Sequence, residues 1–216
     1  MIPDVETRSD DWLERVYSSK DKDALAATYD AWAATYDVDM LTIGYANSAV
    51  AAGLVGRWVR DNEGGILEAG VGTGVLGDIL STLGYRTLTG VDLSEGMLAM
   101  ARARNAYARL ERAVLGERLA FDSGAFGAIV CFGVFTPGHA PCDALDELVR
   151  ITAKRGHLIF TVSTAAWQDC GFEAKLASLE AAGRIALSES TAEYRPMPLS
   201  RTEAHFTTRA YVYEVL

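Results

Sequence analysis

The fold that we predict for this chain of 216 residues follows from one stretch, Ile66-Leu67-Glu68-Ala69-Gly70-Val71-Gly72-Thr73-Gly74. It begins as a short apolar strand and runs into a helical segment at 75–83. The glycines between the two let the backbone turn sharply and approach a ligand with no side chain in the way. Free N–H groups at the start of the helix favour an anionic group. The string therefore predicts a strand, a ligand-binding loop and a helix.

A carboxylate follows the glycines at the end of the next expected strand. That strand covers 87–91, and Asp92 comes directly after it, about twenty residues beyond the loop. At the carboxyl edge of a sheet, such a side chain can accept hydrogen bonds from both hydroxyls of a ribose. The loop and Asp92 together predict a ligand that contains a nucleoside.

Two nucleoside ligands fit these features. Gly72-Thr73-Gly74-Val75-Leu76-Gly77 satisfies the dinucleotide pattern, which is typical of NAD sites. Glu68 precedes the first glycine closely, and its charge would repel a pyrophosphate but attract the ammonium or sulfonium of S-adenosylmethionine. The residues favour S-adenosylmethionine, unless Glu68 faces water or a backbone amide.

The central part of the chain alternates between strands and helices. The expected strands are apolar on both sides, as in a parallel sheet whose two faces are covered by helices. We therefore expect an α/β fold with a doubly wound sheet. The expected strands are 66–67, 87–91, 113–115, 126–132 and 157–162, and the expected helices are 75–83, 94–107, 143–154 and 168–182.

The two ends of the chain differ from this centre. Residues 1–62 show helical spacing without a strand pattern, so we expect an N-terminal helical cap or lid. Residues 63–216 form the expected cofactor-binding core. Its final run, 206–215, alternates in strand fashion and predicts an antiparallel strand pair at the end of the sheet. We treat 1–216 as a single domain, because no linker separates cap from core.

Composition narrows the range of partners. Lys and Arg number 20 against 29 Asp and Glu, a net charge of −9, so nucleic acid is a poor partner. No run approaches the roughly 18 apolar residues that span a bilayer, and the amino terminus does not resemble a secretory signal. We expect a cytoplasmic protein without membrane association. The 3 cysteines form no cluster of metal-ligand spacing, so no metal is expected.

Two motifs resemble those of class I S-adenosylmethionine-dependent methyltransferases. The string 68–74 is similar to the family's first motif, and Gly90-Val91-Asp92-Leu93-Ser94-Glu95-Gly96-Met97 is similar to its second. The resemblance implies a Rossmann-like sheet of seven strands with the last one antiparallel, and S-adenosylmethionine as cofactor. It also implies that Glu68, Gly70 and Gly72 line the methionine moiety, that Asp92 binds the ribose, and that Leu93 flanks the adenine.

Weaker matches and two departures accompany these motifs. Glu117 stands where the family often has an acid near the adenine, whereas Gly127 and Arg155 replace an aspartate and a proline that are usual in the family. The strings 29–37 and 138–142 resemble the methyltransferase-like proteins of the Williams–Beuren region and their bacterial relatives. The candidate cofactor residues of the core are Glu68, Gly70, Val71, Gly72, Gly74, Asp92, Leu93, Met97, Glu117 and Phe132.

One face of the expected cap could lie over the cofactor. Leu25, Tyr29, Trp32 and Tyr36 share a helical face, and the triplet Thr-Tyr-Asp at 28–30 recurs at 35–37. Aromatic rings beside a sulfonium gain roughly 0.5–2 kcal/mol of cation–π attraction. Such a stripe is also typical of core packing, and both interpretations stay open. Tyr29 and Tyr36 are its candidate cofactor contacts.

We expect methyl transfer to a small-molecule acceptor by in-line displacement, with the protein aligning the reactants and excluding water. His139, in a loop after an expected strand, is the candidate general base, although a loop histidine can equally be solvated. Two other functions stay open. A nicotinamide-dependent oxidoreductase is supported only by 72–77 and Asp92, and a non-catalytic cofactor-binding protein would keep the fold without an acceptor site.

Overall fold

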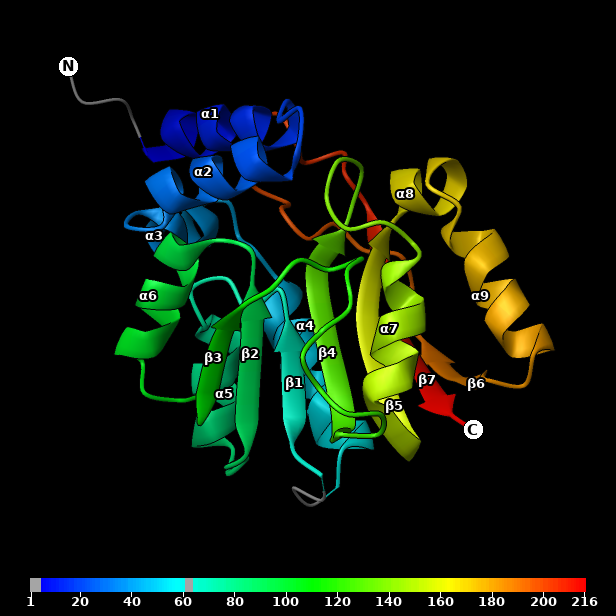
Figure 1. Ribbon diagram of the computed structural model, residues 1–216. Coiled ribbons are helices and arrows are strands. Elements are labelled where there is room, and N and C mark those ends of the chain that lie inside the picture. The colour runs from blue at the N-terminus through cyan, green and yellow to red at the C-terminus, as the bar shows by residue number, and fades with distance from the viewer. Residues whose placement is uncertain (1–4, 61–63) are drawn as a thin grey trace.

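Seven strands of the described residues form one mixed sheet through the middle of the molecule (Figure 1). The computed structural model describes residues 5–60 and 64–216, with side chains from residue 8 onward. The strand order is β3-β2-β1-β4-β5-β7-β6, with β1 to β5 parallel and β7 antiparallel to both neighbours. The predicted doubly wound sheet with an antiparallel end is confirmed. The strands are β1 Ile66–Ala69, β2 Leu88–Asp92, β3 Arg109–Arg112, β4 Phe126–Phe135, β5 Thr152–Ser163, β6 Ile185–Ser190 and β7 Thr208–Val215.

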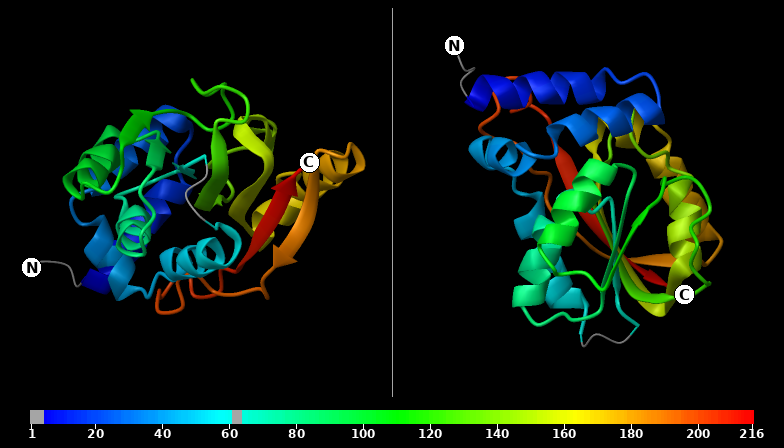
Figure 2. Two further views of the ribbon diagram at one scale, coloured as in Figure 1. Left: turned by 90° about the horizontal axis from the view of Figure 1, so that it is seen from below. Right: turned by 60° about the vertical axis from the view of Figure 1, so that its left-hand side comes forward.

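Helices cover both faces of this sheet (Figure 2). Successive side chains of a strand point to opposite faces, so a strand between two helical layers must be apolar on both. In β1, Ile66 belongs to the core under α4 and α5, whereas Leu67 belongs to the core under α7 and α9. One layer holds α4 Asn47–Trp58, α5 Val75–Thr82 and α6 Glu95–Ala103, and the other holds α7 Ala144–Ile151, α8 Thr164–Asp169 and α9 Phe172–Ala181.

Three further helices, α1 Val5–Tyr17, α2 Lys22–Trp32 and α3 Tyr36–Thr42, lie over the carboxyl ends of the parallel strands (Figure 1). The side chain of Asp21 begins α2 by accepting the N–H groups of Asp23 and Ala24. Of the predicted cap 1–62, residues 1–4 and 61–62 lie outside the described residues, and α4 packs against β4 and β5. The core of the three helices consists of Leu13, Val16, Leu25, Trp32, Met40, Ile43 and Met197.

Some element bounds differ from those predicted. The third strand is Arg109–Arg112, whereas an apolar run at 113–115 suggested it to lie later. This strand is at the sheet edge and no residue of it is fully buried, so it lacks the apolar pattern of a central strand. The helix expected at 143–154 ends at Ile151, and β5 begins at once with Thr152. The run 113–115 instead lines the cavity described below.

The described residues contain neither a single membrane-spanning helix nor a cluster of metal-binding side chains. No single helix there is long and apolar enough to cross a membrane, and only α3 together with α4, bent by 90°, reaches the required length and composition. Nor do three or more His, Cys, Asp or Glu side chains gather at any point of 5–60 and 64–216 in a way that could hold a metal ion.

Candidate functional site

The glycine loop after β1 has a backbone that glycine adopts most readily. Gly70, Gly72 and Gly74 have positive φ angles of 81°, 53° and 82°. The N–H of Gly70 donates to the carbonyl oxygen of Val91 at 2.8 Å, which ties the loop to the end of β2. A Cβ atom on Gly70 would lie 2.3 Å from the side chain of Val134, whereas one on Gly72 would meet nothing within 4 Å. Open space beside Gly72 therefore lets a ligand approach the backbone.

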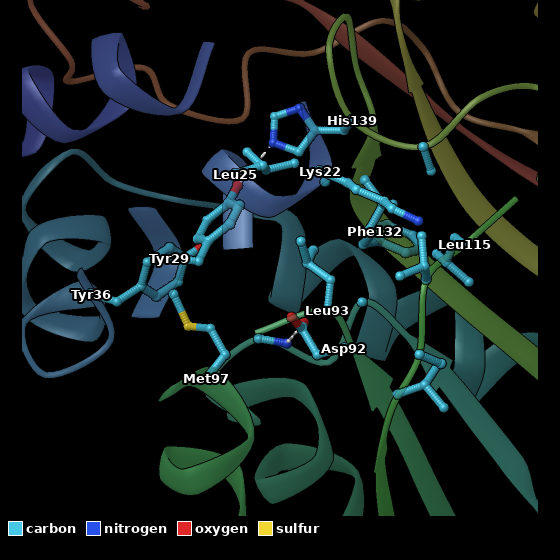
Figure 3. Close-up of a pocket in the computed structure, with 18 of the residues that line it drawn as sticks. Lys22, Leu25, Tyr29, Tyr36, Asp92, Leu93, Met97, Leu115, Phe132 and His139 are labelled. Atoms are coloured by element: carbon cyan, nitrogen blue, oxygen red, sulfur yellow. Dashed lines mark hydrogen bonds between the residues drawn. The ribbon is translucent and has the colours of Figure 1, made fainter. Parts of the chain in front are cut away.

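Asp92 lies at the end of β2, next to this loop (Figure 3). Its Oδ2 accepts a hydrogen bond from the N–H of Gly72 at 2.8 Å, and its Oδ1 accepts one from the N–H of Ser94 at 3.0 Å. Burial raises the pKa of Asp92, and these N–H donors oppose the rise. A carboxylate has about four acceptor positions. Asp92 therefore fixes the loop and keeps acceptor positions for a ligand.

A cavity of about 120 Å³ opens between the glycine loop and the cap, and we call it the cofactor cavity (Figure 3). It lies where the strand order reverses between β1 and β4, the usual place for ligands in such sheets. Nine predicted site residues line it: Tyr29, Tyr36, Gly70, Gly72, Asp92, Leu93, Met97, Phe132 and His139. Lining residues that the sequence did not single out include Lys22, Tyr45, Ala113, Val114 and Leu115.

Glu68 does not line this cavity. It is buried at the end of β1, and its Oε2 accepts a hydrogen bond from the hydroxyl of Tyr107 at 2.6 Å. Burial raises the pKa of Glu68 to about 8, while the Tyr107 hydroxyl opposes the rise and the charge of Asp92 adds to it. The partner of the carboxyl group is thus a tyrosine, which the sequence interpretation did not consider.

Val71, Gly74 and Glu117 also lie outside the cofactor cavity. Val71 packs with Leu98 and Ala101 in a small core of its own. Gly74 precedes α5, and a Cβ there would lie 3.0 Å from Ala101. The carboxylate of Glu117 pairs with the exposed Lys22 ammonium at 2.5 Å, at the rim of the cavity. These residues shape the surroundings of the cavity and do not face its interior.

The aromatic stripe of the cap divides between core and cavity. Trp32 is 1% exposed, and its Nε1–H donates to Oδ2 of the buried Asp39 at 2.8 Å. Tyr29 and Tyr36 both pack against it, with ring centroids 6.2 and 4.7 Å from the Trp32 ring. Because α2 ends at Trp32 and α3 begins at Tyr36, the two tyrosines reach the same cavity from different helices. Trp32 therefore belongs to the core of the cap, whereas Tyr29 and Tyr36 line the cofactor cavity.

The repeated Thr-Tyr-Asp triplets attach the cap to the core through their aspartates. Asp30 Oδ1 accepts hydrogen bonds from the Ser94 hydroxyl at 2.6 Å and from the Gly96 N–H at 2.8 Å, at the start of α6. Asp37 accepts the Thr73 hydroxyl of the glycine loop and pairs with Arg104. The repeat is visible in the sequence, whereas the role of its two aspartates, Asp30 and Asp37, is visible only in the structure. Each triplet therefore places a tyrosine at the cavity and, directly after it, an aspartate that bonds to the core.

His139 lies in the loop after β4, mostly buried, with both ring nitrogens engaged. Its Nε2 is 2.9 Å from the Tyr29 hydroxyl, and its Nδ1 is 2.8 Å from the Thr136 hydroxyl and 3.3 Å from the Pro137 carbonyl oxygen. Burial lowers the pKa of His139, which favours the neutral ring near pH 7. A carbonyl oxygen can only accept, so we assign the proton to Nδ1. The hydroxyl of Tyr29 then donates to Nε2.

Comparison with known proteins gives a consistent result. The family described as "Methyltransferase domain" matches residues 67–160. Residues 67–160 are thus similar to a methyltransferase domain. The chain is also 34% identical over 139 residues to human "Methyltransferase-like protein 27", an alignment that spans 63% of this chain and 56% of that protein. This match confirms the predicted resemblance to methyltransferase-like proteins. The chain spans little more than half the length of the curated relative that it matches.

Solved structures of methyltransferases share the fold. A TehB-like S-adenosylmethionine-dependent methyltransferase from Corynebacterium glutamicum has a TM-score of 0.63 at 18% identity, covering 88% of this chain and 99% of that one. A geranyl diphosphate C-methyltransferase from Streptomyces coelicolor, solved with S-adenosyl-L-homocysteine, has a TM-score of 0.61 at 14% identity, covering 78% of each chain. This chain therefore shares the fold of these methyltransferases.

Proposed function

We propose that this protein transfers the methyl group of S-adenosylmethionine to a small-molecule acceptor by in-line displacement. The observation that carries the proposal is the cofactor cavity, in which Asp92 and the open side of Gly72 lie under the cap tyrosines. We further propose that 1–62 and 63–216 work as cap and core of one domain, with the cap excluding water. Cytoplasmic location and the lack of nucleic-acid and membrane partners belong to the same proposal.

The residues of the cavity fit the chemistry of this cofactor. Asp92 offers acceptor positions for ribose hydroxyls, and Gly70 and Gly72 expose backbone on the methionine side. Leu93 and Met97 supply apolar surface for a flat base. When bound, S-adenosylmethionine supplies a methyl group on a sulfonium, so the protein needs few reactive side chains.

Glu68 and the cap tyrosines carry the rest of the cofactor proposal. The buried carboxyl group of Glu68 lies behind the glycine loop and not in the cavity. From there its ionised form would attract the ammonium group of a bound cofactor without direct contact. Tyr29 and Tyr36 present aromatic rings to the cavity, and such rings attract a sulfonium. We propose that Val71, Gly74 and Glu117 act on the cofactor through the loop and the rim, without direct contact.

His139 is the proposed general base. Its ring is neutral in the assigned state, and its unprotonated Nε2 points to Tyr29, which lines the cavity (Figure 3). A protic acceptor loses its proton as it takes the methyl group, and a neutral imidazole can receive that proton.

Calorimetric titration with S-adenosylmethionine and, separately, with NAD tests the cofactor assignment. We expect a dissociation constant on the order of micromolar for S-adenosylmethionine and no comparable binding of NAD. Asp92→Ala should weaken binding by roughly 1.5–3 kcal/mol, the range for hydrogen bonds to a charged group. Asp146→Ala, an exposed site on α7, is the matched control. Tighter binding of NAD would support the oxidoreductase instead, and cofactor binding without turnover on any metabolite extract would support a non-catalytic protein.

A further inference from the structure

A second cavity adjoins the cofactor cavity on the cap side, and we call it the aromatic chamber. Its volume is about 40 Å³. It shares Tyr29, Tyr36, Tyr45, Gly133 and His139 with the cofactor cavity, so the two cavities are direct neighbours. Its other described lining residues are Leu13, Val16, Tyr17, Trp32, Met40, Asn47, Thr136, Pro196, Met197 and Phe206.

The described lining of the aromatic chamber carries no formal charge when His139 is neutral. The charged residues Lys22 and Asp92 line only the cofactor cavity. Nearby, Asp39 is buried behind Trp32 and paired with Arg8. A charged ligand in such a chamber would lose its hydration without gaining a counter-ion, so an uncharged ligand fits best.

The walls of the chamber are aromatic rings in defined orientations. Tyr17 stacks on Phe206, with ring centroids 6.3 Å apart, and meets His139 edge to face at 6.0 Å. Tyr29 meets Tyr36 at 6.4 Å with an interplanar angle of 61°. Aromatic pairs favour stacked and edge-to-face arrangements, so these walls are suited to a flat ring.

The polar atoms of the chamber favour a hydroxyl on that ring. The Tyr29 hydroxyl donates to Nε2 of His139, so its oxygen is left to accept a hydrogen bond. Within the described residues, the hydroxyls of Tyr17 and Tyr36 have no hydrogen-bond partner. Burial raises the pKa of Tyr17, Tyr29 and Tyr36, and the charges of Glu203 near Tyr17 and of Asp92 near Tyr29 and Tyr36 add to the rise. All three hydroxyls therefore stay protonated and uncharged near pH 7.

We propose that the aromatic chamber binds the methyl acceptor, that the acceptor is an uncharged ring compound with a hydroxyl group, and that Tyr29 receives the hydroxyl's hydrogen bond. This inference rests on the function proposed above and adds to it a substrate class and a residue that contacts the reacting oxygen. The small volume means that side chains of the cap move apart when the ring enters.

Atoms and charges balance in this arrangement. The acceptor oxygen forms a bond to the methyl carbon as the bond from that carbon to sulfur breaks, and the sulfur keeps the electron pair and becomes neutral. The hydroxyl proton passes to Tyr29, whose own proton moves to Nε2 of His139. The products are a methyl ether, a neutral thioether and an imidazolium. Tyr29 is thus a relay between acceptor and base.

Four small monocyclic aromatic probes test the chamber: phenol, anisole, benzoate and benzylammonium. Each is titrated into the protein loaded with S-adenosylhomocysteine and followed by ligand-observed NMR. We expect phenol to bind at least about ten-fold tighter than either ion, because burying an unpaired charge is costly. Phenol should also bind roughly three-fold tighter than anisole, because anisole cannot donate to Tyr29.

Variants locate the probe. In Tyr29→Phe the preference for phenol over anisole should disappear, whereas Tyr85→Phe, whose hydroxyl bonds to α4 outside both cavities, should keep it. Met197→Trp fills the chamber and should abolish binding of phenol, with Val16→Phe as a second filling variant if the first does not fold.

The outcomes separate this inference from the proposed function. Equal or tighter binding of an ion, phenol binding that survives both filling variants, or no probe binding to protein that does bind S-adenosylhomocysteine would each overturn the inference and leave the proposed function standing. Failure of both S-adenosylmethionine and S-adenosylhomocysteine to bind would overturn the proposed function itself.

Discussion

Replacing Glu68 with glutamine should change how the stability of the protein depends on pH. The pKa of Glu68 is raised by burial from its ordinary 4.5 to about 8 in the folded state. Between these values the folded protein holds a proton that the unfolded chain has released. The contribution of Glu68 to stability is therefore complete below pH 4.5 and falls as pH rises toward 8.

The size of the effect follows from the two pKa values. Single-site linkage between a pKa of 4.5 and one of about 8 removes about 3 kcal/mol of unfolding free energy between pH 5 and pH 8. A glutamine amide cannot ionise, and its oxygen can still accept the hydrogen bond from Tyr107, so Glu68→Gln should escape this loss. Relative to the unaltered protein, the variant should gain about 3 kcal/mol over that range.

Urea unfolding at pH 5, 6, 7 and 8, followed by tryptophan fluorescence, measures the difference directly. Glu14→Gln, at an exposed position of α1, is the matched control and should show no such gain. A difference between Glu68→Gln and the unaltered protein that stays constant from pH 5 to pH 8 would refute the reasoning, since it would mean that Glu68 is ionised throughout and has a charged or hydrated partner.

Three further predictions concern the cap and the cofactor. Asp30→Asn should weaken the attachment of the cap to α6 by about 1–2 kcal/mol, which would appear as faster amide exchange in α2. Unchanged exchange would argue that the hydrogen bonds of Asp30 do not hold the cap to α6. Trp32→Phe should lower the unfolding free energy by about 1–3 kcal/mol in denaturation, because the buried Asp39 loses a hydrogen-bond donor. Tyr36→Ala should mainly lower cofactor affinity, measured by calorimetry, or turnover. A Tyr36→Ala variant that loses stability but binds the cofactor normally would show that Tyr36 is a core residue. Binding of S-adenosylmethionine at pH 7 should release up to about one proton from Glu68, measured from calorimetry in buffers of different ionisation enthalpy, and no release would place the ammonium elsewhere.

The sequence predicted the fold well where local pattern and tertiary role agree. The glycine loop and Asp92 each need a particular residue type for a backbone or hydrogen-bonding reason, so their positions are visible in the chain itself. The edge strand Arg109–Arg112 was misplaced because a strand with an exposed side lacks the apolar pattern on which strand prediction depends.

The details of the site depend on contacts between distant parts of the chain. Glu68 accepts a hydrogen bond from Tyr107, which lies 39 positions away in the sequence. No residue close to Glu68 in the sequence indicates that a tyrosine hydroxyl will bind its carboxyl group. The pairing of His139 with Tyr29 spans 110 positions, so the role of Tyr29 could not be separated from that of Tyr36 by spacing alone. The aromatic chamber draws on the cap, β4 and the segment before β7, and only the folded chain brings these together.

A crystal structure of the protein with S-adenosylhomocysteine is the most direct test of the central claim. We predict that both ribose hydroxyls lie within hydrogen-bond distance of the Asp92 carboxylate, with the amino-acid end along Gly70 and Gly72 and the sulfur facing the Tyr29 side of the cavity. A nucleoside whose ribose lies away from Asp92, or a ligand whose sulfur faces away from the cap, would contradict it.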